Sequence, residues 1–183
     1  RTANGANDLR HHIAHIQIVH PDDVGRFAAL GVTANMQPLW ATFEPQMVDL
    51  TIPFIGPERA RWQYPFGSLL RSGARLAAGS DWPVSTPDPW AGMHVAVNRR
   101  HPDGAEGEHG AFLPEQAISL ADALTSYTQG SAFVNHLDAG RITEGALADL
   151  VVLDRNPFTA PQESIAETAV VATFVAGTEV FCR

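Results

Sequence analysis

Polar residues that could take part in catalysis lie at three separate apolar runs of the sequence. They are a histidine cluster (His11, His12, His15, His20), Gln37-Pro38, and Ser80-Asp81-Trp82-Pro83. Zinc and related metals take imidazole and carboxylate ligands, and a carboxylate beside a metal-bound water can also accept its proton. Metal-assisted chemistry is therefore a candidate function for these three positions.

Each of these residues also has a structural interpretation. His11, His12 and His20 are typical of surface or packing residues when taken alone. His15 lies in an isoleucine-rich run, where a buried imidazole would need a specific partner. Asp81 follows a strand-like run and is either a cap of a helix or turn, or a functional acid. Spacing alone leaves these alternatives open.

Alternating strand-like and helical segments would bring the three positions together. Apolar runs predict strands over Ile13–Val19, Val32–Leu39 and Ala74–Gly79. A helix is expected from Pro21 to a glycine cap at Gly31, and another over Phe66–Arg71. In a parallel α/β barrel the carboxyl ends of all strands point to one face, so His15, Gln37 and Asp81 would converge there.

The second half of the chain changes from a helical to a β pattern. Helices are expected from about Trp90 to Arg100, and after Ser119, where Asp122 completes a pattern resembling a capping box. Beyond them the predicted strands are Leu150–Leu153, Val170–Val175 and Glu179–Phe181, with a hairpin turn at Ala176-Gly177.

Composition limits the classes of partner. The chain has 183 residues, 45% of them hydrophobic, which is enough for a buried core. Its formal charge of −8 disfavours binding to nucleic acid or to an anionic membrane surface. Cys182 is the single cysteine, and no apolar run approaches the roughly 20 residues of a membrane span. We expect a soluble, cytoplasmic protein whose chain, starting at Arg1 rather than Met, is truncated or cleaved.

Several segments, in the same order, resemble the amidohydrolase superfamily, and most of all its amidohydrolase 3 (YtcJ-like) branch. These segments are Arg10–Gln17, Tyr64–Leu70, Gly79–Val84, Ala123–Thr128 and Gly140–Asp154. The resemblance spans nearly the whole chain, and several motifs in order are far more specific than one.

The resemblance implies a role for two residues. His15 matches the metal-binding histidine after barrel strand six, and Asp81 matches the aspartate after strand eight, which touches the metal and takes a proton from the attacking water. The family's glutamate before the strand-six histidine is Ala14 here, and a neighbouring arginine is His12, so the surroundings of the metal differ.

The other metal-site residues of the family should lie before Arg1. They are the paired histidines after strand one, a bridging Lys or Glu after strand four, and a histidine after strand five. His109, in a predicted loop, and His136, near a helix end, do not replace them. A catalytic zinc needs about three protein ligands, and this chain offers two. We therefore expect the isolated chain to be inactive.

The sequence thus predicts an α/β fold. Residues 1–138 would form strands six to eight of a TIM (β/α)8 barrel, and residues 139–183 part of a small β-sandwich. The parent protein would hydrolyse a C–N bond in an amide or N-acyl small molecule, using one or two divalent metal ions, with zinc as first candidate. Gln37, Trp82 and Pro83 would line the substrate pocket.

The expected partners are the small-molecule substrate, the N-terminal remainder of the barrel, and a second copy in a homo-oligomer. One rival interpretation is a non-catalytic piece, structural or interacting, of a dead homologue. Another is hydrolysis of an ester or a different bond at the same site, since fold and metal do not fix the substrate.

Overall fold

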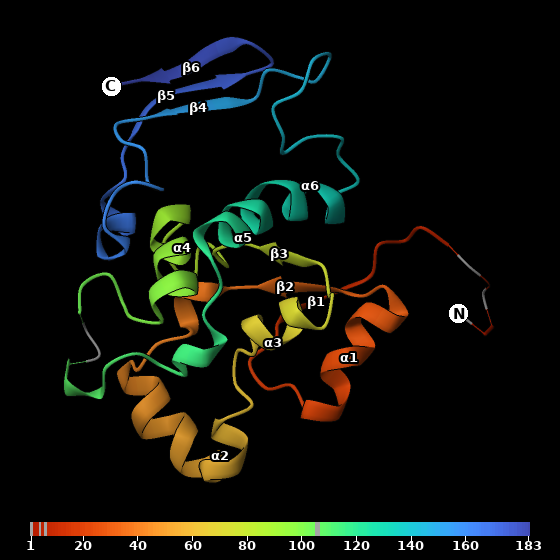
Figure 1. The fold of residues 1–183 in the computed structure, drawn as a ribbon, viewed down its shortest axis with the longest axis vertical. Coiled ribbons are helices and arrows are strands. Elements are labelled where there is room, and N and C mark those ends of the chain that lie inside the picture. Colours follow the sequence, from red (N-terminus) through yellow and green to blue (C-terminus); the bar gives the residue numbers. More distant parts are fainter. Residues whose placement is uncertain (1, 4, 6, 105–106) are drawn as a thin grey trace.

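The computed structural model describes residues 2–3, 5, 7–104 and 107–183, and it places two separate three-stranded sheets among short helices (Figure 1). The first sheet is parallel, in the order β1 (His12–His15), β2 (Thr33–Met36) and β3 (Leu76–Ala78). The mixed α/β class predicted from the sequence is confirmed. Three strands in a row leave β1 and β3 as the edges of this sheet among the described residues.

Helix α1 (Pro21–Leu30) connects β1 to β2 and begins and ends where the sequence predicted. Pro21 occupies the first turn with Asp22 and Asp23, whose charge suits the positive end of the helix dipole. Gly31 closes the helix in the left-handed conformation, with φ of 66°. The helix packs against β2 and α3.

The connection from β2 to β3 is longer and more irregular. After β2 come a 3-10 turn (Pro38–Trp40), a π-helical segment (Gln46–Thr51), and then α2 (Ile52–Ala60) and α3 (Phe66–Arg71). The bounds of α3 are those predicted. Helix α2 was not predicted from the sequence because Gly56 and Pro57 interrupt it. Gly56 has φ of 77°, which bends the segment out of helical geometry.

Short helices follow β3 and pack back onto it. Helix α4 (Pro89–Asn98) starts at Asp88, whose carboxylate accepts a hydrogen bond of 2.9 Å from the Trp90 amide. Helix α5 (Leu120–Thr125) starts at the predicted Ser119 cap. A π-helical turn (Ser126–Gly130) and α6 (Ser131–Val134) then contact β3 (Figure 1).

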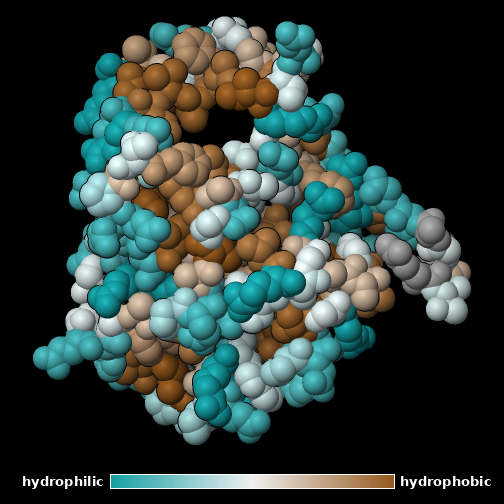
Figure 2. Space-filling model, in the orientation of Figure 1, coloured by the Kyte–Doolittle hydropathy of each residue, from teal (hydrophilic) through white to brown (hydrophobic). Residues whose placement is uncertain are grey.

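The second sheet is antiparallel and consists of β4 (Leu150–Leu153), β5 (Val170–Val175) and β6 (Thr178–Cys182). Ala176 and Gly177 form the predicted two-residue turn, both with positive φ. A 3-10 helix, Gln162–Glu167, lies between β4 and β5 and packs against α4. Figure 2 shows apolar atoms gathered on this sheet at the top of the molecule; its exposed members are Val151, Val152, Val175, Val180 and Phe181.

A fully buried arginine lies at the centre of the fold. Arg99 ends α4, and its guanidinium donates hydrogen bonds to the backbone carbonyls of Phe112 (2.7 Å) and Tyr64 (3.4 Å). The guanidinium also lies 5.1 Å from the centre of the Phe66 ring. Burial lowers the pKa of Arg99 to about 9, so the group stays charged at neutral pH. Arg99 therefore ties two segments, one around Tyr64 and Phe66 and one around Phe112, to the end of α4.

Replacing Arg99 by methionine should destabilise the protein. Methionine keeps an unbranched, flexible stem but leaves the Tyr64 and Phe112 carbonyls without donors, at a cost of about 2 kcal/mol. Urea unfolding of the wild type and Arg99→Met would measure this difference. Arg59→Met, on the exposed part of α2, is the matched control and should be neutral. Equal midpoints for all three proteins would contradict the role given to Arg99.

None of the described helices combines the length and the apolar character needed to cross a membrane.

Candidate metal centre

The carboxyl ends of the three parallel strands lie level with one another. His15, the last residue of β1, pairs with Met36 at the end of β2, and Met36 pairs with Ala78 at the end of β3. Gln37 directly follows β2, and Asp81 lies three residues beyond β3. The topology therefore places all three predicted positions at or after the carboxyl ends of strands in one parallel sheet; whether their side chains meet around a metal stays a prediction.

A buried glutamine fixes the backbone of His15. The Gln37 side-chain oxygen accepts a hydrogen bond of 2.6 Å from the His15 amide, and its side-chain nitrogen donates to Asn35 at 3.2 Å. Only 6% of Gln37 is exposed. Both ends of the amide are thus engaged between β1 and β2, so in this chain Gln37 orients His15. A contact of Gln37 with substrate stays a prediction.

The environment of His15 differs from the one predicted. The strand ends at His15 rather than at Val19, because His15 and Ile16 both take positive φ, of 66° and 49°, and turn the chain out of the sheet. The imidazole is exposed rather than buried, and 52% of Ile13 is exposed as well. The reason is that β1 is an edge strand, which no other described strand covers.

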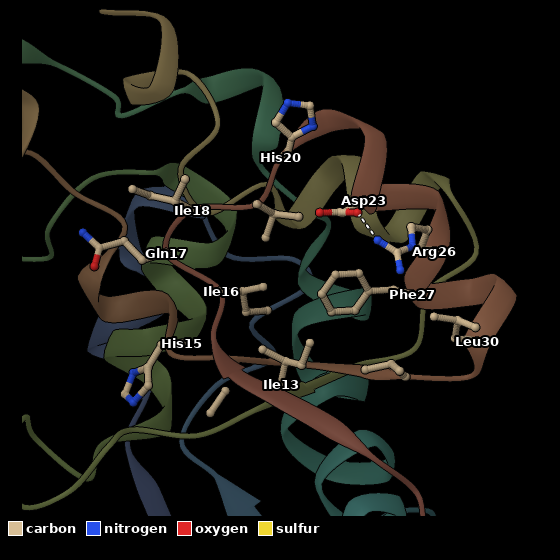
Figure 3. A pocket seen from close by; sticks show the side chains of 13 residues that line it. Ile13, His15, Ile16, Gln17, Ile18, His20, Asp23, Arg26, Phe27 and Leu30 are labelled. Carbon is tan, nitrogen blue, oxygen red and sulfur yellow. Dashed lines mark hydrogen bonds and ion pairs between the residues drawn. The ribbon is translucent and has the colours of Figure 1, made fainter. Parts of the chain in front are cut away.

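Figure 3 shows the two sides of this segment. Ile13, Ile16, Phe27 and Leu30 gather around a groove between β1 and α1, with a volume of about 470 Å³, while the His15 side chain points away from them. An ion pair between Asp23 and Arg26 borders the same groove. His15 is among the residues that line the groove, but its imidazole points away from the apolar side chains.

Asp81 lies in a tight turn after β3. Its backbone has φ of 61°, and its carbonyl accepts a hydrogen bond of 2.8 Å from the Val84 amide across the cis Trp82-Pro83 bond. The Trp82 amide donates to the Ser80 hydroxyl at 3.2 Å. The Asp81 carboxylate itself accepts no hydrogen bond from the described residues, so the structure gives no support to the capping interpretation.

Trp82 and Pro83 are exposed beside this turn, with 66% of Trp82 accessible. Their predicted contact with substrate stays a prediction.

The remaining histidines of the cluster have other roles or none assigned. His20 caps α1, since its Nδ1 atom accepts a hydrogen bond of 3.2 Å from the Asp22 amide, and its ring packs edge-on against Trp62 at 4.8 Å. His11 and His12 are exposed. Across the described residues, no three or more His, Cys, Asp or Glu side chains are grouped closely enough to hold a metal ion.

A small recess beside His15 was not predicted from the sequence. It has a volume of about 120 Å³ and is lined by His15, Gln17, Trp40, Glu44, Gln46, Met47, Thr51 and Tyr64. Burial raises the pKa of Glu44, with His101 opposing the shift, and burial followed by the negative charge of Glu44 raises that of Tyr64. Glu44 and Tyr64 come from the irregular β2–β3 connection, where no local pattern pointed to a shared recess.

Comparison with known proteins assigns the family. The sequence matches the profile of the Amidohydrolase family over residues 1–181. The chain belongs to the amidohydrolase family. This amidohydrolase chain is 35% identical over 182 residues to the protein LONG AFTER FAR-RED 3 of Arabidopsis thaliana, covering 98% of the chain and 30% of that protein. It is 27% identical to YtcJ of Bacillus subtilis (strain 168), covering 85% and 28%.

The names of two further relatives state a reaction or a class of enzyme. An N-substituted formamide deformylase of Arthrobacter pascens is 34% identical over 116 residues, which cover 62% of the amidohydrolase chain and 20% of that enzyme. The crystal structure of an uncharacterized metal-dependent hydrolase from Pyrococcus horikoshii OT3 superposes with a TM-score of 0.68 at 32% identity, covering 84% and 30%. The chain thus spans less than a third of the length of these relatives.

Proposed function

We propose that this chain is the C-terminal part of an amidohydrolase barrel, with β1, β2 and β3 as strands six, seven and eight. Residues 1–138 would then supply the last three strands of the barrel, and residues 139–183 would contribute β4, β5 and β6 to a β-sandwich. Three adjacent parallel strands, followed by a separate antiparallel sheet, support this assignment. The superposition on the Pyrococcus horikoshii hydrolase, at 30% coverage of that chain, is consistent with it.

The open edge of β1 indicates where the remainder of the barrel would bind. Unpaired backbone groups on an edge strand are a template for a further strand. The groove beside β1, lined by Ile13, Ile16 and Phe27, offers an apolar surface for a neighbouring helix (Figure 3). The partner in this proposal is therefore the N-terminal part of the same protein, and a homo-oligomer joined at this edge is the alternative.

His15 and Asp81 would hold a divalent metal, most simply zinc, as one ion or as part of a pair. Their donor atoms, imidazole nitrogen and carboxylate oxygen, suit such an ion, and both residues lie at the carboxyl ends of parallel strands. Both also have positive φ, a conformation that His and Asp adopt more readily than most residues and that is concentrated at functional sites.

When bound, such a metal polarises a carbonyl and lowers the pKa of water. In this reaction Asp81 would accept the proton of the attacking water and pass it to the leaving nitrogen. Its carboxylate is suited to this because no described residue donates a hydrogen bond to it. Gln37 would keep His15 in register by holding its amide. A C–N bond is the proposed target because the related Arthrobacter pascens protein is named for deformylation of N-substituted formamides.

The observation that carries this proposal is that His15 and Asp81 both follow the aligned carboxyl ends of strands in one parallel sheet, and metal removal tests it. We expect the full-length protein to hydrolyse at least one member of a panel of N-formyl and N-acetyl amines, to lose that activity with a chelator, and to regain it with zinc. The isolated 183-residue chain should remain inactive with zinc, because two ligands fall short of the roughly three that a catalytic zinc needs.

Turnover of the full-length protein and of the isolated chain, each measured metal-free, zinc-loaded and chelated, decides between the interpretations. Activity of the full-length protein that is indifferent to chelation would contradict the metallohydrolase. A full-length protein that binds zinc but turns over no amide or ester would favour the non-catalytic homologue. Preference for esters over amides would favour the second enzymatic rival.

A further inference from the structure

The recess beside His15 holds one acidic side chain whose charge is not balanced from within the recess. Of the residues that line it, Glu44 is the carboxylate, and neither Lys nor Arg is among them. No described residue donates a hydrogen bond to the Glu44 carboxylate or forms an ion pair with it, and the charge interaction that opposes the rise of its pKa comes from His101, which does not line the recess. Glu44 is nevertheless half-buried, and a carboxylate withdrawn from water without a partner is unfavourable.

The walls of the recess are held by contacts from several segments. The Tyr64 amide donates to the Gln17 carbonyl at 3.0 Å, and the Tyr64 carbonyl accepts from Arg99. The Tyr64 ring packs edge-on against Phe66 at 5.9 Å. The recess is therefore part of the packed fold rather than a gap between loose side chains.

A second polar group in the wall has no partner. The indole nitrogen of Trp40 is buried, and no described residue accepts a hydrogen bond from it. The recess thus combines the Glu44 carboxylate with the aromatic side chains of Trp40 and Tyr64; the Trp40 N–H remains available to an acceptor of the substrate rather than to its cationic group. Carboxylates and aromatic rings together are suited to binding a positively charged nitrogen.

We infer that Glu44 determines substrate specificity by binding a positively charged N–H group of the substrate, such as a primary ammonium, next to the scissile amide. The inference rests on the proposed function, since His15 of the proposed metal site borders the recess. With about 120 Å³, the recess is smaller than the roughly 300–1,000 Å³ of whole-ligand pockets. It therefore accommodates one end of a substrate whose amide lies at His15 and Asp81.

A matched pair of amides tests this in the full-length, zinc-loaded protein. N-acetylputrescine carries an ammonium where N-pentylacetamide carries a methyl group, and the two are otherwise alike. We expect kcat/KM to favour N-acetylputrescine by about tenfold, the effect of one charge-assisted hydrogen bond. Glu44→Gln should reduce this preference to about twofold or less, while Glu44→Asp, which keeps the charge, should retain most of it.

The control variant is Glu58→Gln, on the exposed surface of α2, and it should leave the preference unchanged. A second readout separates this inference from the proposed function: calorimetric binding of butylammonium to the metal-free protein, compared between wild type and Glu44→Gln. Binding that needs Glu44 supports the cation site even if neither amide is hydrolysed, a result that would count against the hydrolase alone. Amide hydrolysis with no ammonium preference, unaffected by Glu44→Gln, overturns the inference and leaves the hydrolase standing.

Discussion

Replacing Asp81 by asparagine in the full-length protein should reduce kcat/KM for its amide substrate by about 10²–10⁴-fold, the usual contribution of a general base. Asparagine keeps the size of the side chain and an oxygen that can face a cation, but it cannot accept a proton at neutral pH. The structure makes this a clean substitution, because no described residue hydrogen-bonds to the Asp81 carboxylate. The folded state should therefore be as stable as the wild type.

Steady-state kinetics with zinc-loaded protein, together with metal analysis of the purified variant, would measure the effect. Asp49→Asn is the matched control: this exposed aspartate lies in the β2–β3 connection and does not line the recess beside His15. If Asp81→Asn retained wild-type kcat/KM with full metal content, Asp81 could not be the proton acceptor. If the variant lost its zinc as well as its activity, the result would support Asp81 as a metal ligand but would not demonstrate its role as proton acceptor.

Gly130→Ala should lower the free energy of unfolding by about 3 kcal/mol or more, the upper range for overpacking. Gly130 is where the helical segment after α5 crosses β3. An added Cβ would overlap the Leu76 carbonyl oxygen and lie 3.0 Å from the Cα of Ala77. Both are backbone atoms of β3, which cannot turn aside as a flexible side chain could. The strand or the helix would have to shift.

Thermal and urea unfolding of the full-length protein would measure this change. Gly25→Ala gives a control of opposite sign, since Gly25 lies inside α1 with open space around its Cα. Alanine favours a helix interior over glycine by about 0.8–1.0 kcal/mol, so Gly25→Ala should raise stability. If both substitutions had the same effect, the close approach of Gly130 to β3 would be wrong.

Local signals predicted most of the regular structure. The proline at the start and the glycine at the end of α1 fix its bounds, and the Ser119 cap fixes the start of α5. The turn at Ala176-Gly177 could also be predicted, because glycine adopts the positive φ that a two-residue hairpin needs and strand-like runs lie on both sides of it. Each of these features depends on residues only a few positions apart.

The contacts that shape the site were not readable in this way. The hydrogen bond from the His15 amide to the Gln37 side chain links two segments 22 residues apart. The alternation of apolar and polar residues does not indicate which backbone amide a glutamine will bind. The exposure of His15 depends on β1 being an edge, a property of the sheet rather than of the residues around His15. Glu44 and Tyr64 share a recess only because an irregular connection folds back, so the sequence showed neither as a site residue. His15 and Asp81 themselves were singled out by family resemblance and strand topology together.

The two sheets differ in how far along the chain their pairings reach, and this sets an expected order of folding. The β5–β6 pairing closes across the two residues Ala176 and Gly177, and hairpins of this kind form in about 1–10 μs. The pairing of Ala34 with Leu76 must instead wait until the whole β2–β3 connection has been organised. The antiparallel sheet should therefore acquire protection from hydrogen exchange before the parallel strands that carry His15 and Asp81, so that the proposed metal ligands are among the last parts of the chain to reach their places.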